Sequence, residues 1–465
     1  ETCRYADLLL PAASWGEKEG TVTNSERRVS HVRLAIAAPG EARADWSITC
    51  DFARRLESLM RPGQASLFDF NNPAALFEEY KLLTQGRDLD LSGLSHALID
   101  QLGPQQWPFP VGSESGTQRL YEDGVFPTEN GRARFLAEQY QAPKEKREAR
   151  FPLTLNTGRL RDQWHGMSRT GTAARLFGHV EEALLSMNGD DMRRRRLLDG
   201  QLVKVRSRRG ELLLPVHQDD SLRPGQAFLP MHWGDRFLKG LGINSLTLPA
   251  FDPISKQPEL KHAGVEVEKV ELPWQFFALV EGSVQKRFEA LRPLFEGFAY
   301  ASFSLTGRER PALVIRAACN EPPSHTQLAK LEQLLGLDEG PVLVYDDPRR
   351  SVGKRVRIED GRIVALSLSG ETAARDWLKQ LWHDGKADQA LRRWLLAPLS
   401  TPPGGDVRPA KTLCNCMNVS QDAICSGIER GLDLNGLKRE LGCGTSCGSC
   451  VPEIKRLLVK QPAVA

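Results

Sequence analysis

Two closely spaced cysteine pairs near the C-terminal end constrain this chain more than any other feature. Cys414 and Cys416 are separated by one residue, Cys447 and Cys450 by two, and thirty residues lie between the pairs. Each short loop turns two sulfurs toward one point, so the four thiolates can converge on one metal centre. Zinc and iron–sulfur clusters both accept four thiolates, and the spacing alone leaves both open. A disulfide is disfavoured because the composition gives no secretory signal.

The segment between and after the cysteine pairs predicts three helices. Ser420 and Asp433 are typical N-cap residues, and each precedes apolar residues at helical spacing and then a glycine. Pro452 suits the first turn of a third helix. This places Cys447 and Cys450 at a helix N-terminus, where backbone N–H groups and the helix dipole stabilise anionic sulfur.

Length and charge bound the remaining possibilities. A chain of 465 residues is too long for one core and predicts three to four domains. The net charge of +3 is small against 62 basic and 59 acidic residues, so composition favours no nucleic-acid partner. We interpret the basic run 193–196 as a solvated helix face. No apolar stretch approaches the ~20 residues of a membrane span.

The first 150 residues predict an incomplete α/β unit. We expect a buried strand in the opening segment 2–11, where the strand-length apolar run 8–13 begins. A polar glycine-bearing loop at 16–24, a polar strand and a helix near 45–59 should follow. Residues 61–150 read as irregular, with helical pieces near 73–84 and 91–102. Because the chain begins with Glu1 and opens on such a segment, we expect it to be a C-terminal piece of something larger.

Residues 151–272 predict a β-barrel-like domain. A strand at 151–156 leads into the loop 157–165, and 201–216 alternates on both sides of Arg209 and Gly210, which is typical of a hairpin. A further strand at 227–230 is followed by His232 and Trp233, and we expect this tryptophan in the core.

A different composition follows from 273 to 400. The pair Asp360–Gly361 predicts a two-residue hairpin turn, and apolar residues at helical spacing from Ala374 to Trp382 predict an amphipathic helix. This region reads as a small structural or docking α/β domain. Residues 399–411, which include Pro402 to Gly405, predict the linker to the cysteine-rich segment.

The C-terminal segment resembles a known iron–sulfur family. Residues 412–458, with C-x-C, the run GTSCGSC and the run VPEIKRLL, are similar to the bacterioferritin-associated-ferredoxin type of [2Fe-2S] domain. The resemblance implies a [2Fe-2S] cluster on Cys414, Cys416, Cys447 and Cys450. Cys443 and Cys425 have no counterpart among those ligands, and we expect Cys425 in the core.

Residues 1–272 resemble the C-terminal half of the molybdopterin oxidoreductases of the dimethyl-sulfoxide-reductase class. Residues 5–28 and 126–135 are similar to the end of their pterin domain, and 155–165 and 249–261 to their dinucleotide-binding domain. The resemblance implies an α/β multidomain chain. Its parts would be the end of the pterin-binding domain (1–150), a double-psi-like dinucleotide-binding barrel (151–272), an accessory α/β domain (273–400) and a helical [2Fe-2S] domain (412–460).

The same resemblance implies molybdenum bound by molybdopterin guanine dinucleotide. Such a ligand needs cations for a pyrophosphate and planar polar groups for the pterin. The implied cofactor contacts lie mainly in one run of the chain: Thr157, Gly158, Arg159, Arg161, Trp164, His165, Gly166, His232, Asn244 and Lys261. Asn24 and Arg27 are weaker candidates, since Arg27 and Arg28 could equally end a solvated strand.

Within this class, the motifs are most similar to those of bacterial nitrate reductases, and the added [2Fe-2S] domain resembles that of cytoplasmic assimilatory catalytic subunits. The resemblance implies two-electron reduction of nitrate to nitrite, with electrons delivered by a reductase subunit, ferredoxin or flavodoxin. A formate dehydrogenase-like enzyme and a non-catalytic iron–sulfur electron-transfer protein stay open. The C-x-x-C-x-x-x-C run of a [4Fe-4S] site and the molybdenum ligand are expected only outside this sequence, and Cys3 and Cys50 are isolated.

Overall fold

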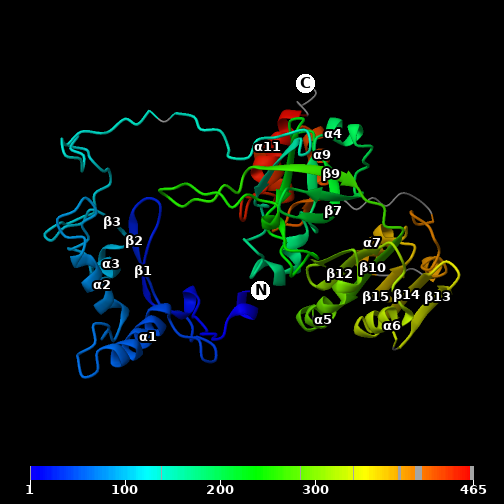
Figure 1. Cartoon of the computed structure of the whole chain (residues 1–465), viewed down its shortest axis with the longest axis horizontal. Coiled ribbons are helices and arrows are strands. Elements are labelled where there is room, and N and C mark those ends of the chain that lie inside the picture. Colours follow the sequence, from blue (N-terminus) through cyan, green and yellow to red (C-terminus); the bar gives the residue numbers. More distant parts are fainter. Residues whose placement is uncertain are drawn as a thin grey trace. The chain divides into compact units, whose positions relative to one another are not determined.

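The computed structural model describes residues 2–137, 139–282, 284–338, 340–385, 389–403 and 411–460. The chain divides into two compact units, Glu1–Tyr140 and Gln141–Ala465, which we describe separately. Figure 1 shows the elements of both units in chain order. The division into four domains stays a prediction.

The first unit combines a three-stranded antiparallel sheet with three helices. The sheet order is β1 (Gly20–Thr23), β2 (Arg28–Val32) and β3 (Gln105–Gln106). The helices are α1 (Asp45–Met60), α2 (Pro73–Leu82) and α3 (His96–Leu102), and the side chains of Asn72 and Ser95 cap the last two. A small apolar core of six buried residues holds them together: Val29, Phe77, Leu91, Leu94, Ile99 and Phe109.

Two expectations for this unit were wrong. The apolar run 8–13 of the predicted buried strand is extended chain with one isolated bridge, Ala12 to Arg43, and Leu8 and Leu9 are 71% and 59% exposed. A strand needs a partner for its backbone groups, and the described residues offer this segment none beyond that bridge. The predicted loop 16–24 contains strand β1, which pairs with β2 from Gly20 opposite Val32 to Thr23 opposite Val29.

The second unit begins with a closed six-stranded barrel, as predicted. Its order is β4 (Leu153–Gly158), β8 (Gln226–Pro230), β5 (Leu185–Met187), β7 (Glu211–Gln218), β6 (Leu202–Arg206) and β9 (Ala263–Lys269). The pairs β4–β8 and β5–β7 are parallel and the others antiparallel. Alternate strand residues fill the interior, and the short helix α4 (Gly189–Arg194) exposes Arg193 and Arg194 to solvent.

A six-stranded antiparallel sheet follows the barrel. Its order is β11 (Tyr300–Thr306), β12 (Ala312–Cys319), β10 (Trp274–Glu281), β15 (Arg362–Ser369), β14 (Val352–Glu359) and β13 (Val342–Asp347). The helices are α5 (Val284–Leu291), α6 (His325–Leu334), α7 (Arg375–Asp384) and α8 (Gln389–Arg392). Asp360 and Gly361 have φ of 49° and 76°, as the predicted hairpin turn requires.

The cysteine-rich segment forms a small helical domain. It contains the two-stranded ladder of β16 (Thr412–Cys414) and β17 (Val419–Ser420), then α9 (Gln421–Glu429), α10 (Leu434–Leu441) and α11 (Val451–Lys460). Ser420 and Asp433 cap α9 and α10 as predicted, and Gly442 ends α10 in the left-handed conformation. Residues 404–410 of the predicted linker lie outside the described residues.

Candidate thiolate centre and cofactor loop

The four paired cysteines meet at one end of the small helical domain. The sulfurs of Cys414 and Cys416 lie 3.7 Å apart, and those of Cys416 and Cys447 lie 3.6 Å apart. Cys450 lies next to Cys414, which acts on its thiol. Helix α11 (Val451–Lys460) begins directly after Cys450, as the sequence predicts. The structure therefore brings together all four cysteines that the spacing selected.

The arrangement of the four sulfurs bears on which metal centre they can hold. They form a row from Cys447 through Cys416 and Cys414 to Cys450, and among the described residues no three of them lie mutually within 4.8 Å. A single tetrahedral ion with metal–sulfur bonds of about 2.3 Å would bring all four within about 3.8 Å. The row is therefore longer than one tetrahedral zinc ion requires.

The surroundings of the row favour the ionised, thiolate form of Cys414 in particular. Burial opposes ionisation of Cys414, but hydrogen bonds from the backbone of Gly444 and Met417 and from neighbouring thiols lower its pKa. Burial and the partner Cys414 raise the pKa of Cys450 to about 12. The two ends of the row also differ, because Cys447 is exposed and Cys450 is buried. The row thus has one end in solvent and one end inside the protein.

The two remaining cysteines of the segment lie outside the row. Cys443 is fully buried and its thiol points to the carbonyl of Leu437 at 3.6 Å. Burial raises its pKa. Cys425 lies on α9 and is partly exposed, so it is less buried than we expected for a core residue.

Strand β4 of the barrel leads into the loop that the sequence selected for a cofactor. Three exposed side chains gather there: the guanidinium of Arg159 lies 5.0 Å from the Trp164 ring centre and 3.3 Å from Nε2 of His165. The rings of Trp164 and His165 meet edge to face at 4.5 Å. The loop therefore presents one cation and two planar rings to solvent, which are the groups that a phosphate and a flat heterocycle would contact.

His232 holds this loop from inside. Its Nε2 accepts the backbone N–H of Leu160 at 2.7 Å, and its Nδ1 donates to the carbonyl of His165 at 2.7 Å. The imidazole is fully buried, and burial, with the nearby Arg159 and His165, lowers its pKa. Both ring nitrogens are used, so His232 positions the loop and has no free polar atom for a ligand.

Thr157, Gly158 and Lys261 also fix the loop to the barrel. Thr157 Oγ1 donates to the carbonyl of Leu260 at 2.8 Å, and Lys261 Nζ donates to the carbonyl of Thr157 at 2.6 Å. A Cβ at Gly158 would lie 2.7 Å from the ring of Phe228, so the glycine is required by packing against β8. Thr157 and Gly158 form the end of strand β4, whereas we predicted them in the loop.

Two other residues that we predicted as cofactor contacts, Gly166 and Asn244, are exposed. Gly166 is exposed, and a Cβ added there would meet no atom within 4 Å, which leaves open space beside the loop. Asn244 is exposed in the turn Ile243–Ser245, next to Gly242, which approaches the backbone of Trp233. Trp233 is buried, as expected.

In the first unit, Arg27 and Asn24 serve the β1–β2 turn. Arg27 donates to the carbonyls of Trp107 and Gln118, and the Asn24 carboxamide accepts from the backbone of Arg28 at 3.0 Å. These bonds use both side chains within the unit, and they give no support to a cofactor contact.

Arg161 faces the cysteine domain, away from the exposed cluster of Arg159. Its Nη1 lies 2.5 Å from Oε2 of Glu453 on α11, and its Nη2 lies 3.1 Å from Asp162. Asp162 in turn accepts from the side chain of Asn415 at 3.0 Å, between the first two cysteines. His179 Nε2 approaches the other oxygen of Glu453 at 3.3 Å.

These contacts join the cofactor loop directly to the thiolate row. Sequence reasoning missed Asp162, His179, Asn415 and Glu453, because nothing in their spacing indicates that they meet. Two of them could have been found from their position beside predicted site residues, since Asp162 follows Arg161 and Asn415 lies inside the C-x-C pair.

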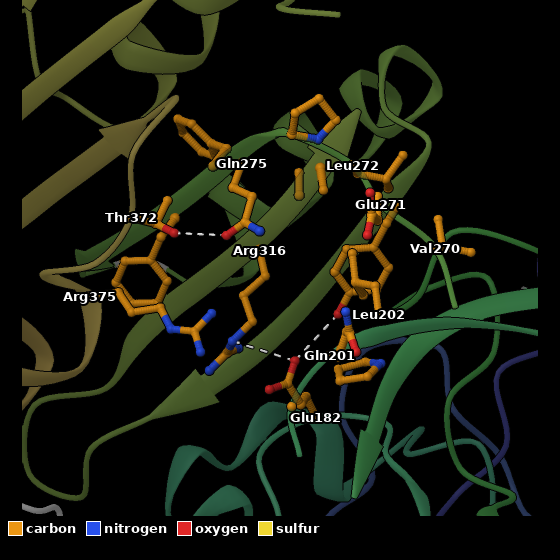
Figure 2. A pocket seen from close by; sticks show the side chains of 18 of the residues that line it. Glu182, Gln201, Leu202, Val270, Glu271, Leu272, Gln275, Arg316, Thr372 and Arg375 are labelled. Carbon is orange, nitrogen blue, oxygen red and sulfur yellow. Dashed lines mark hydrogen bonds and ion pairs between the residues drawn. The ribbon is translucent and has the colours of Figure 1, made fainter. Parts of the chain in front are cut away.

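A cavity of about 410 Å³ lies between the barrel and the six-stranded sheet, as Figure 2 shows. Four of its polar groups pair with one another: Arg316 lies 3.5 Å from Glu182, and Thr372 donates to Gln275 at 3.0 Å. Burial and Glu182 raise the pKa of Tyr300, which keeps its hydroxyl protonated. None of the predicted site residues lines this cavity, and we interpret it as structural.

Three family models match the chain. Residues 153–264 match the molydopterin dinucleotide binding domain, residues 1–55 match molybdopterin oxidoreductase, and residues 412–460 match the BFD-like [2Fe-2S] binding domain. The first covers the barrel and the cofactor loop, and the last covers the thiolate row. The predicted family is thereby confirmed for these three segments.

Curated relatives agree with the family models. A nitrate reductase of Klebsiella oxytoca is 33% identical over 100% of this chain and 52% of its own length. The assimilatory nitrate reductase catalytic subunit of Bacillus subtilis is 32% identical over 57% of the chain and 36% of its length. The F420-dependent formate dehydrogenase subunit alpha of Methanocaldococcus jannaschii is 34% identical over 58% and 38%. The chain thus spans about half the length, or less, of the curated relatives it matches.

Proposed function

We infer that this chain, which carries the dinucleotide-binding and BFD-like [2Fe-2S] domains of the molybdopterin oxidoreductase family, is part of a nitrate-reducing enzyme. The reaction would convert nitrate, two electrons and two protons into nitrite and water, in nitrate assimilation. The observation that carries the proposal is the contact between α11 and the cofactor loop, made by Glu453 and Arg161. That contact links an electron-transfer domain to a dinucleotide site.

The residues fit a molybdopterin guanine dinucleotide at the loop. Arg159 would contact the pyrophosphate, and Trp164 and His165 would contact planar rings of the ligand, since all three are exposed and adjacent. Lys261 is exposed beside the same strand end. When bound, the molybdenum cofactor would supply the oxygen-atom and electron chemistry, and the protein its binding and orientation.

The row of sulfurs gives the electron path a direction. Cys447 is exposed and can meet a protein donor such as a reductase subunit, ferredoxin or flavodoxin. Cys450 is buried, and burial raises its pKa. The positive charge of Arg161 acts in the opposite direction, to a smaller extent. Electrons that enter a [2Fe-2S] cluster at the Cys447 end would therefore leave it at the Cys450 end, beside Arg161 and the loop after β4.

The extent of the matches favours nitrate over formate. Two relatives that match 98% or more of the chain are nitrate reductases, from Klebsiella oxytoca and Shewanella frigidimarina. The formate dehydrogenase of Methanocaldococcus jannaschii matches 58%, a share similar to the 57% of the Bacillus subtilis nitrate reductase. The [4Fe-4S] site and the molybdenum ligand are expected in the rest of the protein.

We propose a cytoplasmic enzyme on the strength of its likeness to assimilatory relatives. As a separate finding, no helix among the described residues has the length and apolarity to cross a membrane.

The test uses the full-length enzyme, purified with its cofactors. With reduced viologen as donor, nitrite should form from nitrate, and with oxidised viologen as acceptor, formate should not be oxidised. Arg159→Ala should lower the bound molybdopterin, because it removes a charge-assisted contact typically worth roughly 1.5–3 kcal/mol. Arg193→Ala, an exposed arginine on α4 of the same barrel, should leave the molybdopterin content unchanged and serves as the matched control. Formate oxidation without nitrite formation would overturn the assignment.

A further inference from the structure

Three side chains that the cofactor and cluster sites do not use converge in the first unit. Among the described residues, Glu19, His31 and His96 form a set whose ligand atoms all lie within 4.8 Å of one another. Oε1 of Glu19 lies 3.1 Å from Nε2 of His31 and 3.7 Å from Nδ1 of His96. Glu19 precedes β1, His31 lies on β2 and His96 begins α3, so three parts of the unit contribute one ligand each.

These distances match the edges of a metal's coordination polyhedron. Bonds of about 2.0–2.1 Å to nitrogen and oxygen in a tetrahedral site put neighbouring ligand atoms about 3.4 Å apart. The two measured distances to Glu19 lie on either side of that value. The imidazoles themselves lie with ring centres 4.3 Å apart. An ion between the three atoms would therefore need only small side-chain rotations.

The buried, unsatisfied ring nitrogens of His96 are independent evidence for a bound ligand between these three side chains. Only 8% of the residue is exposed, and neither ring nitrogen has a hydrogen-bond partner. Buried polar atoms are nearly always satisfied, and an unsatisfied one costs about 1–3 kcal/mol. A cation would satisfy Nδ1, which faces Glu19.

Asp100 orients the second histidine. Its carboxylate accepts from Nδ1 of His31 at 2.8 Å, which directs the Nε2 lone pair toward Glu19 and His96. Metal-bound histidines almost always donate their other N–H to such a carboxylate or carbonyl. Arg33, which contacts the same oxygen at 2.6 Å, holds the carboxylate in place. A ligand and the group that supports it are thus both present.

We propose that Glu19, His31 and His96 bind one zinc or similar borderline divalent cation, with a fourth position open to water. Two imidazoles and one carboxylate are a ligand set that such ions accept. Because the ligands come from the start of the β1–β2 hairpin, from β2 and from α3, the ion would connect the hairpin to the helix. The residues of this site are not among those assigned to the molybdenum cofactor or the iron–sulfur cluster, and the inference does not rest on the proposed function.

Cobalt(II) binding to the purified full chain tests the proposal, because cobalt reports its ligands by colour. The wild type should show d–d bands from a nitrogen–oxygen site in addition to any thiolate-to-cobalt charge transfer from the cysteine row. Glu19→Gln, whose exposed side chain keeps its shape, should remove the nitrogen–oxygen bands and lower zinc content by one ion per chain. Cys447→Ser should reduce only the thiolate bands.

Two further variants complete the design. Asp100→Asn should lower zinc affinity about 10–100-fold, because it removes the support of a ligand without removing the ligand. His217→Gln should have no effect, since His217 pairs with Asp199 at 3.0 Å on the surface without a second histidine. Zinc content and cobalt spectra identical in wild type and Glu19→Gln would overturn the site, as would the same loss in His217→Gln.

Discussion

The guanidinium of Arg161 lies 2.5 Å from the carboxylate of Glu453, so an ion pair joins the loop after β4 to the helix that follows Cys450. Both side chains are largely buried, with 14% and 31% of their surface exposed. Residues 292 positions apart in the chain thus hold the cluster domain against the cofactor loop. Under the proposed function, electrons would cross between the two sites at this contact.

Reversing one charge of this pair should loosen the cluster domain. Arg161→Glu places two carboxylates, its own and that of Glu453, where a cation was, and Asp162 lies beside them. Breaking a charge-assisted contact costs about 1.5–3 kcal/mol, so undocking should increase roughly 10–100-fold. The measurement is the rate at which a protease separates residues 412–460 from the barrel, compared with wild type.

The double variant Arg161→Glu with Glu453→Arg should recover much of the protection, and Arg206→Glu should leave it unaltered. The latter is the matched control, because Arg206 pairs with Glu268 at 2.7 Å on the exposed side of the barrel. Equal cleavage rates in wild type and Arg161→Glu would show that the ion pair does not hold the domain.

Loss of the His232 side chain should disorder the cofactor loop. His232→Ala leaves the N–H of Leu160 and the carbonyl of His165 without their partner, at a cost of roughly 1–3 kcal/mol each when buried. His232→Gln can donate and accept in the same positions and should restore part of the loss. Proton exchange at Leu160 in the two variants measures this, and unchanged protection in His232→Ala would refute it.

The thiolate row predicts which cysteines matter. Cys447→Ser should abolish the visible absorption of a [2Fe-2S] cluster, because it removes one end of the row. Cys443→Ser should retain the absorption, since that sulfur contacts the carbonyl of Leu437. The check is the ultraviolet–visible spectrum before and after dithionite, together with iron content. A colourless protein with one zinc per chain would argue for a mononuclear site.

Acid-sensitive ion pairs of Glu181, which precedes β5 of the barrel, should help to hold the six-stranded sheet and helix α7 in place. Glu181 contacts Arg316 at 2.6 Å and Lys379 at 2.5 Å; burial opposes its ionisation, but these cations lower its pKa to about 2. Because folding lowers the pKa of Glu181, its ionised carboxylate stabilises the folded state at pH values above its pKa in the unfolded chain. This stabilisation is lost as the pH falls from about 5 to about 2.

Glu181→Gln should therefore lower the free energy of unfolding by roughly 3 kcal/mol at pH 7, and by much less near pH 3. Urea unfolding at both pH values measures the difference. Glu268→Gln, at an exposed pair, should change little at either pH. A difference between wild type and Glu181→Gln that does not depend on pH would contradict the account.

Local signals made most of the second unit predictable. Capping residues such as Ser420 and Asp433, the Asp360–Gly361 turn and the alternation around Gly210 each specify their element through neighbours in sequence. Barrel closure followed from the strand pattern together with the family resemblance. The buried strand predicted in the opening segment failed because apolar composition does not reveal whether a pairing strand is available.

The roles of individual loop residues could not be read in the same way. Arg159 and Arg161 look equivalent in sequence, yet one is exposed beside Trp164 and the other binds Glu453. His232 was expected to contact the cofactor, and the structure shows both of its nitrogens bonded to the loop backbone. Such assignments depend on long-range partners, which spacing does not encode.

The central claim is that electrons reach the molybdenum site through the C-terminal cluster domain. Deleting residues 412–465 from the intact enzyme tests it most directly, with nitrite formation measured for two donors. Reduced viologen can reach inner centres without docking, so dye-driven activity should stay largely unchanged. Activity with the protein donor should fall at least about tenfold further, which corresponds to about 1.4 kcal/mol or more in barrier height. Equal loss with both donors would contradict the account and assign the domain a purely structural role.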